Sequence, residues 1–148
     1  MKLSQTAEYA LRVLAFMATR EGDSPFRARD LSRDTGIPLD YLSKVMRRLV
    51  EGGLLSSRKG HGGGFDFARP LSRIHFIDIL TAMGYETQAT NCVFGWGECN
   101  EQNPCPLHSF WSDIKNDFVN WAETYTLADV SAKGDPSVFR AGFFDDRR

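Results

Sequence analysis

Four glycines fall within the five residues from Gly60 to Gly64, and this run restricts the fold more than any other feature of the chain. Glycine at such density disfavours both a helix and the interior of a strand, so the run must form a turn. The flanking segments LLSSRK and FDFARP have the composition and length of short strands. The sequence therefore predicts a β-hairpin whose tip carries almost no side-chain bulk. A nucleotide-binding phosphate loop is less favoured, because the run leads into a strand and lacks the Gly-Lys-Ser/Thr of a Walker loop.

Three helices are predicted before this hairpin. The first follows a Ser4 cap and continues to about residue 19 as an apolar core helix. The second is expected over residues 28–35 with Gly36 as its C-cap, and the third over residues 39–51. Because a tight turn joins the second helix to the third, the pair matches a helix-turn-helix, whose second helix enters the DNA major groove.

The third predicted helix has an apolar stripe and an opposite polar, basic face. The stripe repeats at helical spacing through Leu42, Val45, Met46, Leu49 and Val50, and should face the core. Cations beside the hairpin tip would attract phosphate while the bare backbone approaches a groove. The candidate DNA-contact residues on this helix and at the hairpin are Asp40, Tyr41, Ser43, Lys44, Arg47, Arg48, Arg58, Lys59, Gly60, His61, Gly62 and Gly63.

Charge is distributed unevenly along the chain, although the net charge is only -1. The residues up to Arg73 carry 13 Lys and Arg against 8 Asp and Glu, whereas the remainder carries 5 against 11. A basic half beside an acidic half indicates nucleic acid as the partner of the first. The alternative is a chance unevenness on a solvated surface.

All three cysteines, Cys92, Cys99 and Cys105, lie in the segment NCVFGWGECNEQNPCPLH, which ends with His108. Three thiolates and an imidazole on one loop indicate a metal or iron-sulfur site. The intervals of six, five and two residues are wider than the pairs usual in zinc loops and suit a cluster wrapped by a loop. An iron-sulfur cluster is favoured, with zinc or redox-active thiols as alternatives. The odd number of cysteines and the lack of a secretory leader argue against disulfides and predict a reduced, cytoplasmic protein.

The second half is predicted to be helical on both sides of the cysteine segment. A helix ending at Gly84 and the polar linker YETQATN precede it. A long helix with a heptad-like, aromatic-rich seam follows, and one small domain offers too little surface to bury that seam. The sequence therefore predicts a homodimer, with packing on the chain's own N-terminal domain as the alternative. The predicted dimerisation residues are Leu107, Phe110, Trp111, Ile114, Phe118 and Trp121.

Three parts are expected along a mainly α chain with a small β-hairpin wing. Residues 1–72 should form a winged helix-turn-helix domain, and residues 73–131 the connecting helix, the cysteine loop and the dimerisation helix. Residues 132–148 should form a polar, mobile tail. Thr126 and Asp129 predict a capping box and a last short helix. No run of 18 apolar residues occurs, so no membrane partner is expected.

These segments together resemble the bacterial iron-sulfur winged-helix transcriptional regulators of the IscR and NsrR type, over about residues 1–130. The resemblance is carried, in this order, by MKLSQTAEYALRVL, PLDYLSKVMRRL, RKGHGGGFDFARP, the three-cysteine loop and YTLADV. It implies a homodimer on a palindromic double-stranded operator, with one cluster per subunit held by Cys92, Cys99 and Cys105. Such a regulator, expected to be a repressor, would sense iron-sulfur status, redox stress or nitric oxide.

The resemblance leaves the fourth cluster ligand open between two residues. In IscR-type members a histidine three positions after the last cysteine completes a 2Fe-2S cluster, and His108 stands there. In NsrR-type members a carboxylate from the partner subunit's first helix can complete a 4Fe-4S cluster, and Glu8 stands near that place. His108 and a 2Fe-2S cluster are favoured, because the histidine is local and neutral imidazole is a good ligand. His75 is expected to be a satisfied core histidine within its helix.

No enzyme is predicted, because no Ser-His-Asp or Cys-His arrangement stands out. The main alternative is a zinc-stabilised or thiol-redox DNA-binding regulator, which would be colourless where an iron-sulfur protein is brown. A small electron-transfer protein is more remote, since it would need neither a basic helix nor a wing. In the favoured mechanism the loop orders the junction between the winged domain and the dimer helix, which sets the distance between two recognition helices.

Overall fold

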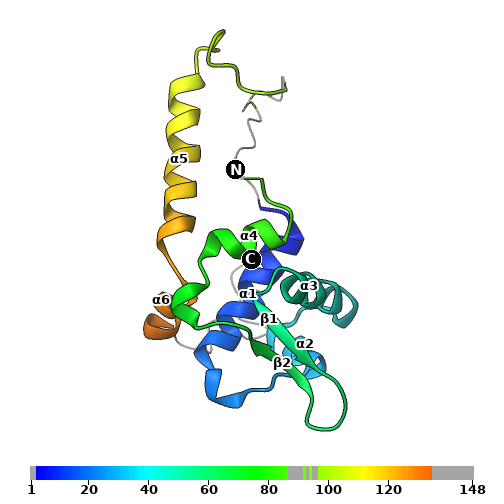
Figure 1. The fold of residues 1–148 in the computed structure, drawn as a ribbon. Helices are drawn as coiled ribbons and strands as arrows, with labels where there is room; N and C mark the ends of the chain where they lie inside the picture. The colour runs from blue at the N-terminus through cyan, green and yellow to red at the C-terminus, as the bar shows by residue number, and fades with distance from the viewer. Residues whose placement is uncertain (1–2, 87–91, 93, 95–96, 135–148) are drawn as a thin grey trace.

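A computed structural model describes residues 3–86, 92, 94 and 97–134 of the chain (Figure 1). The mainly helical architecture with one hairpin is confirmed. Its elements are, in order, α1 (Gln5–Thr19), the 3-10 helix η1 (Glu21–Asp23), α2 (Ala28–Thr35), α3 (Leu39–Glu51), β1 (Leu55–Arg58), β2 (Gly64–Phe67), the 3-10 helix η2 (Leu71–Arg73), α4 (Phe76–Ala82), α5 (His108–Thr124) and α6 (Leu127–Lys133).

Helix α1 lies at the centre of the hydrophobic core, as its composition predicts. The Ser4 hydroxyl oxygen accepts the Ala7 N–H at 3.2 Å and caps the helix. Every residue from Val13 to Ala18 is buried, because α2, α3, α4 and α6 all pack on this helix. Burial on all sides explains why apolar residues fill successive positions and do not form a single stripe.

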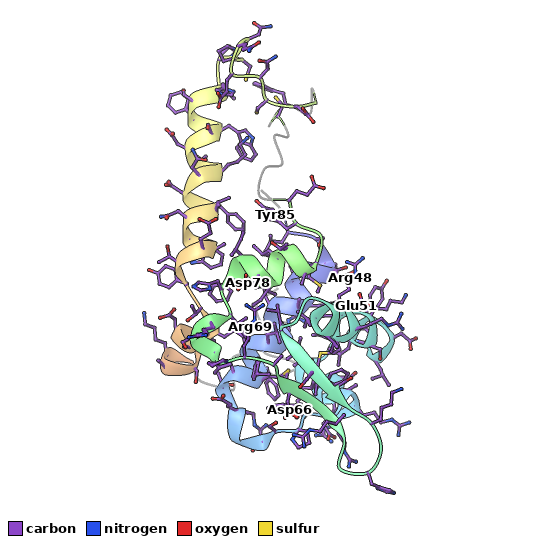
Figure 2. All side chains as sticks on the ribbon, in the orientation of Figure 1. Arg48, Glu51, Asp66, Arg69, Asp78 and Tyr85 are labelled. Carbon is purple, nitrogen blue, oxygen red and sulfur yellow. The ribbon has the colours of Figure 1, made fainter. Side chains whose placement is uncertain are left out.

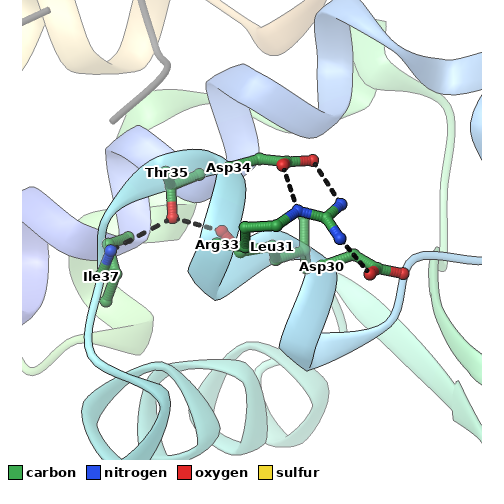
Figure 3. A network of polar contacts seen from close by, with 6 residues as sticks. All are labelled: Asp30, Leu31, Arg33, Asp34, Thr35 and Ile37. Atoms are coloured by element: carbon green, nitrogen blue, oxygen red, sulfur yellow. Dashed lines mark hydrogen bonds and ion pairs between the residues drawn. The ribbon is translucent and has the colours of Figure 1, made fainter. Parts of the chain in front are cut away.

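Helices α2 and α3 form the predicted helix-turn-helix with the predicted bounds. Gly36 ends α2 in the left-handed conformation, with φ 72°, which glycine adopts without steric cost. The buried Thr35 hydroxyl donates to the Leu31 carbonyl at 2.6 Å and accepts the Ile37 N–H at 3.5 Å (Figure 3). The Ser32 hydroxyl donates to the Ile37 carbonyl at 2.6 Å. These bonds hold the turn and therefore the orientation of α3 relative to α2.

The predicted hairpin is confirmed in strands β1 and β2, which pair antiparallel with Arg58 opposite Gly64. Phe26, which precedes α2, extends this pairing: its N–H donates to the Phe65 carbonyl at 2.9 Å, and the Phe65 N–H donates back at 2.7 Å. A Cβ at the buried Gly63 would collide with the Arg58 carbonyl oxygen. The turn itself therefore requires glycine at this position.

Helix α5 leaves the winged domain as a long, single helix, and α6 turns back against α1 (Figure 1). Two backbone bonds join the base of α5 to the segment around α4. The Phe76 N–H donates to the Tyr125 carbonyl at 3.1 Å, and the Leu127 N–H donates to the Ile74 carbonyl at 3.0 Å. The Phe76 ring also stacks on Trp121 with centroids 5.0 Å apart. The base of α5 is thus bonded to the winged domain, whereas its far end projects away.

Two expectations for this region are wrong, and two others concern residues that the structure does not describe. His75 was expected inside a helix as a core residue, but it precedes α4, and its side chain is 38% exposed. Its N–H donates to the Asp78 carboxylate at 2.9 Å, so it caps the helix. Helix α6 also continues to Lys133, two residues into the expected tail. Residues 135–148 of that tail and most of the linker lie outside the described residues.

Asp129 forms the predicted capping interaction at the start of α6. Its carboxylate accepts the Thr126 N–H at 2.9 Å and the Thr126 hydroxyl at 3.1 Å. The backbone bond first, and then the hydroxyl bond, lower the pKa of Asp129 below its usual value. Because folding favours the charged carboxylate, this stabilisation is present at neutral pH and is lost as the pH falls below about 4, through the lowered folded pKa.

We therefore expect Asp129→Asn to lower the thermal midpoint at pH 7. The difference from the wild type should shrink as the pH falls below about 4, since the wild-type carboxylate is then protonated as well. Thermal unfolding followed by circular dichroism at several pH values measures this difference. Asp113→Asn, at an exposed position of α5, is the matched control and should change neither quantity. A difference that is the same at every pH would contradict the role of the Asp129 charge.

Candidate functional site

The outer face of α3 presents the six polar and basic residues that the sequence analysis selected, Asp40, Tyr41, Ser43, Lys44, Arg47 and Arg48, all of them exposed. Together with Thr6, part of this face lines a shallow hollow of about 330 Å3. Arg48 differs from its neighbours, because its guanidinium donates to the Met83 carbonyl at the long distance of 3.5 Å and so leans toward the end of α4.

Aromatic contacts join this face of α3 to α1. The Tyr41 ring meets Tyr9 edge-on with centroids 6.1 Å apart, and the Lys44 ammonium lies 5.9 Å from the Tyr41 ring. On the other side, the Arg12 guanidinium lies 5.5 Å from the Tyr9 ring, and the Gln5 amide donates to the Tyr9 hydroxyl at 3.0 Å. The orientation of the exposed Tyr41 is therefore set partly by α1.

The wing presents Lys59 and His61 to solvent at its tip. Gly60 and Gly62 in the loop, and Gly64 at the start of β2, have positive φ values. These values shape the turn of the hairpin. Arg58, also selected from the sequence, is exposed, but its guanidinium is bonded to Asp66 on the opposite strand. The sequence analysis missed Asp66. The predicted hairpin could have indicated this residue, because pairing LLSSRK with FDFARP brings the cation of one strand close to the carboxylate of the other.

Carboxylate neighbours divide the cations of the winged domain into two groups. Arg33 lies 2.9 Å from Asp34 and 3.2 Å from Asp30, and the hydrogen bond and charge of Asp34, then Asp30, raise the pKa of Arg33 (Figure 3). By contrast, six exposed cations of this domain form no ion pair with any residue that the structure describes, namely Arg27, Arg29, Lys44, Arg47, Arg48 and Lys59. Arg27 and Arg29, at the start of α2, were not selected from the sequence, although an Arg-Ala-Arg at a helix start is a visible signal.

The structure brings the four candidate cluster ligands to one place. Cys92, Cys99, Cys105 and His108 line a single hollow of about 270 Å3 near the N-terminal end of α5. All four are partly buried. The Cys92 N–H donates to the Gly97 carbonyl at 2.8 Å, and the His108 N–H donates to the Cys105 carbonyl at 3.0 Å, so the loop folds back on itself.

Three thiols and an imidazole are the donor types that an iron-sulfur cluster takes, so the residues lining this hollow fit such a group chemically. Within the described part of the chain, however, no three His, Cys, Asp or Glu side chains already converge as a metal-binding group. Glu8 does not line this hollow. It lies beside a separate apolar groove with Leu11, Ala15, Phe76, Trp121 and Val130.

The seam of α5 is largely open to solvent. Phe110 is 67% exposed and Ile114 is 53% exposed, and Leu107 and Trp121 are also exposed. Trp111 and Phe118 are half-buried, and Phe118 packs edge-on against Tyr85 with centroids 5.7 Å apart. Among the described residues, Phe76 and Tyr85 pack against the base of this apolar face, whereas Phe110 and Ile114 stay exposed.

A helix-turn-helix with an exposed basic second helix, followed by a glycine-tipped hairpin, defines a winged-helix DNA-binding protein. Residues 3–133 match the Rrf2 family, described as an iron-dependent transcriptional regulator, and the chain belongs to this family. The family resemblance inferred from the sequence is confirmed.

Known relatives agree with this assignment. The HTH-type transcriptional regulator IscR of Yersinia pseudotuberculosis serotype O:1b (strain IP 31758) is 31% identical over 130 residues, which are 88% of this chain and 79% of that protein. IscR of Escherichia coli O1:K1 / APEC is 29% identical over 88% of this chain and 80% of that protein. These relatives are transcriptional regulators and not enzymes, in agreement with the sequence analysis.

Solved structures share the fold at low sequence identity. CymR (YrzC), the global cysteine regulator of B. subtilis, has a TM-score of 0.77 and 21% identity, covering 91% of this chain and 99% of that chain. T. potens IscR has a TM-score of 0.74 and 20% identity, covering 98% and 96%. In the part of the chain that the structure describes, no helix has the length and apolar character needed to cross a membrane.

We expect Arg47→Ala and Lys59→Ala to weaken DNA binding by this transcriptional regulator in different ways. If Lys59 contacts phosphate, its loss should reduce the slope of log affinity against log salt by about one unit at every sequence. If Arg47 reads a base, its loss should cost about 1–3 kcal/mol and relax specificity at one position. Fluorescence anisotropy with duplexes selected from a random pool, at several salt concentrations, separates the two effects.

Arg33→Ala is the matched control, since it removes a cation that two carboxylates already neutralise. It should change affinity much less than either variant. Equal effects of all three substitutions would mean that overall charge, and not these positions, governs binding.

Proposed function

We propose that this Rrf2-family regulator binds its operator under the control of an iron-sulfur cluster held by Cys92, Cys99, Cys105 and His108. The observation that carries the proposal is that these four residues, spread over the loop, line one hollow. A 2Fe-2S cluster is favoured, because an imidazole completes the set locally. The protein would act as a repressor in the bacterial cytoplasm, sensing iron-sulfur status, redox stress or nitric oxide.

DNA recognition is assigned to residues 1–72. Helix α3 would enter the major groove with the exposed face that carries Lys44 and Arg47, while the wing approaches the adjacent backbone or minor groove. The exposure of these residues and the lack of ion-pair partners for Arg47 and Lys59 among the described residues support this assignment. The other residues selected on α3 and the wing would surround these contacts.

The interface of a homodimer is assigned to residues 73–131. An apolar face that includes Phe110 and Ile114, on a helix that projects from its own domain, would be unstable in water and is best buried by a second copy of itself. A two-fold dimer presents two recognition helices, which fits a palindromic operator. The exposed end of α5 supports dimerisation over packing on the chain's own domain.

Control by the loop follows from its position at the free end of α5. When bound, the cluster supplies exchangeable, redox-active ligation at iron. His108 begins α5. If binding or loss of the cluster changes how well ordered the cysteine loop is, the first turn of α5 would respond directly. The base of α5 is bonded to α4, and α4 contacts α1 and α3. The loop would thereby alter the relative position of the two recognition helices in the dimer.

A zinc-stabilised or thiol-redox regulator is the second candidate function. One observation favours it, since the described thiols line a hollow without converging as a metal-binding group. A similar structure, CymR, is also named a cysteine regulator, although 21% identity relates only the folds. A small electron-transfer protein is not supported, because the family is regulatory.

The first test of the cluster removes one thiolate. We expect Cys99→Ala to abolish the visible absorption of protein purified without air while leaving a folded dimer, because all three thiolates are needed. Absorption spectra, with iron and sulfide determinations, measure this. Ser109→Ala, at an exposed position next to His108, is the control and should keep full absorption. A colourless wild type that contains zinc would instead support the alternative.

The second test identifies the fourth ligand. His108→Ala should labilise the cluster at neutral pH, because it removes the imidazole that would coordinate iron. His108→Cys should retain a cluster with altered absorption and a lower potential. Glu8→Ala should leave the spectrum unchanged.

The reverse pattern, in which only Glu8→Ala destroys the cluster, would place the fourth ligand on the partner subunit. Glu8 lies outside the cysteine hollow of its own chain, so cluster content would then depend on dimer formation. That result would favour a 4Fe-4S cluster and nitric oxide as the signal.

A further inference from the structure

A carboxylate holds the arginine of the wing in place. Arg58 ends β1, and both its Nε and Nη2 donate to the same oxygen of Asp66, at 2.9 and 2.6 Å. Asp66 lies on β2 opposite Ser56, two residues from Arg58 along the ladder. The ion pair therefore runs diagonally across the hairpin, on the strand that leads into the glycine tip.

The two partners differ in their access to solvent. The Arg58 side chain is 65% exposed, whereas the Asp66 side chain is only 14% exposed. Figure 2 shows Asp66 on the hairpin, above the wing loop in that view. The bonds occupy Nε and Nη2 of Arg58, which leaves Nη1 for another acceptor. The arrangement is thus a half-buried anchor that supports an exposed cation.

We propose that Asp66 is a positioning residue for DNA binding, which orients Arg58 so that its Nη1 meets a phosphate oxygen of the duplex. The proposal rests on the proposed contact of the wing with DNA. An exposed arginine samples many rotamers, and ordering it on binding reduces affinity. Asp66 orders the side chain before DNA arrives, because two donors of the rigid guanidinium are held by one half-buried oxygen.

Charge alone predicts the opposite effect. Asp66 is an anion close to a polyanion, so simple electrostatics would have its removal strengthen DNA binding. If orientation dominates, Asp66→Asn must weaken binding although it makes the wing more positive. The sign of this one change therefore separates positioning from bulk charge.

The experiment uses the full-length protein and a fluorescent duplex that the wild type has selected from a random-sequence pool. Dissociation constants are measured by anisotropy over a range of salt concentrations. Asp66→Asn should bind about 3- to 10-fold more weakly, the cost of ordering one long side chain. Arg58→Ala should bind more weakly with a salt slope reduced by about one unit. The double variant should bind no more weakly than Arg58→Ala, because Asp66 acts only through Arg58.

Two further variants keep the result clear. Asp23→Asn removes the carboxylate of another ion pair, with Arg20 at 2.7 Å on η1, and should not weaken binding. Arg58→Lys keeps the charge but cannot place two donors on one oxygen, and should behave like Asp66→Asn. Thermal melts of each variant confirm folding before binding is measured.

The failures are distinguishable. Weakened binding by Arg58→Ala, with unchanged or tighter binding by Asp66→Asn and Arg58→Lys, overturns the positioning role and leaves the wing on DNA. Unchanged affinity and salt slope in both Arg58→Ala and Lys59→Ala remove the wing from the DNA contact altogether, and the positioning role with it.

Discussion

The burial of α1 is the interaction on which the rest of the structure depends. Ala10, Val13, Leu14 and Met17 are fully buried, and four other helices pack around them. Burying such side chains contributes about 1.5–3 kcal/mol for each large one, so α1 acts as the common support of the winged domain. The support extends to the outer face of α3 through Tyr9. It also extends to α6, and through α4 to the base of α5.

Positions of carboxylates, more than the number of cations, shape the surface offered to DNA. The first half of the chain carries an excess of positive charge, yet Arg20 and Arg33 are each held by nearby aspartates. A cation that is already paired neutralises little phosphate charge, so it releases few of the counterions condensed on DNA. The cations without such partners among the described residues include Arg47 and Lys59, on the two elements that a winged helix brings to DNA.

The N-terminal end of α5, where the cysteine hollow is, lies at the opposite end of the molecule from the wing; Figure 1 shows this placement of the two elements. The residues that line the hollow are not part of the buried core, so a change of ligand at these residues would leave the winged domain folded. One of them, His108, begins α5, whose exposed seam is the surface proposed for dimerisation. A chemical change at the thiols would thus act on the interface between subunits and leave the DNA-binding fold itself intact.

Local signals in the sequence determined the bounds of α1, α2 and α3, the caps at Ser4, Gly36 and Thr126, the hairpin and the buried stripe of α3, because each depends on near neighbours in the chain. The clustering of the cysteines and His108 also followed from their spacing. Tertiary structure alone decided how Asp66 on β2 meets Arg58 on β1, that Arg48 leans toward the end of α4, and that Tyr41 contacts Tyr9 of α1. These outcomes depend on distances between side chains of different elements, and no periodicity along the chain encodes such distances.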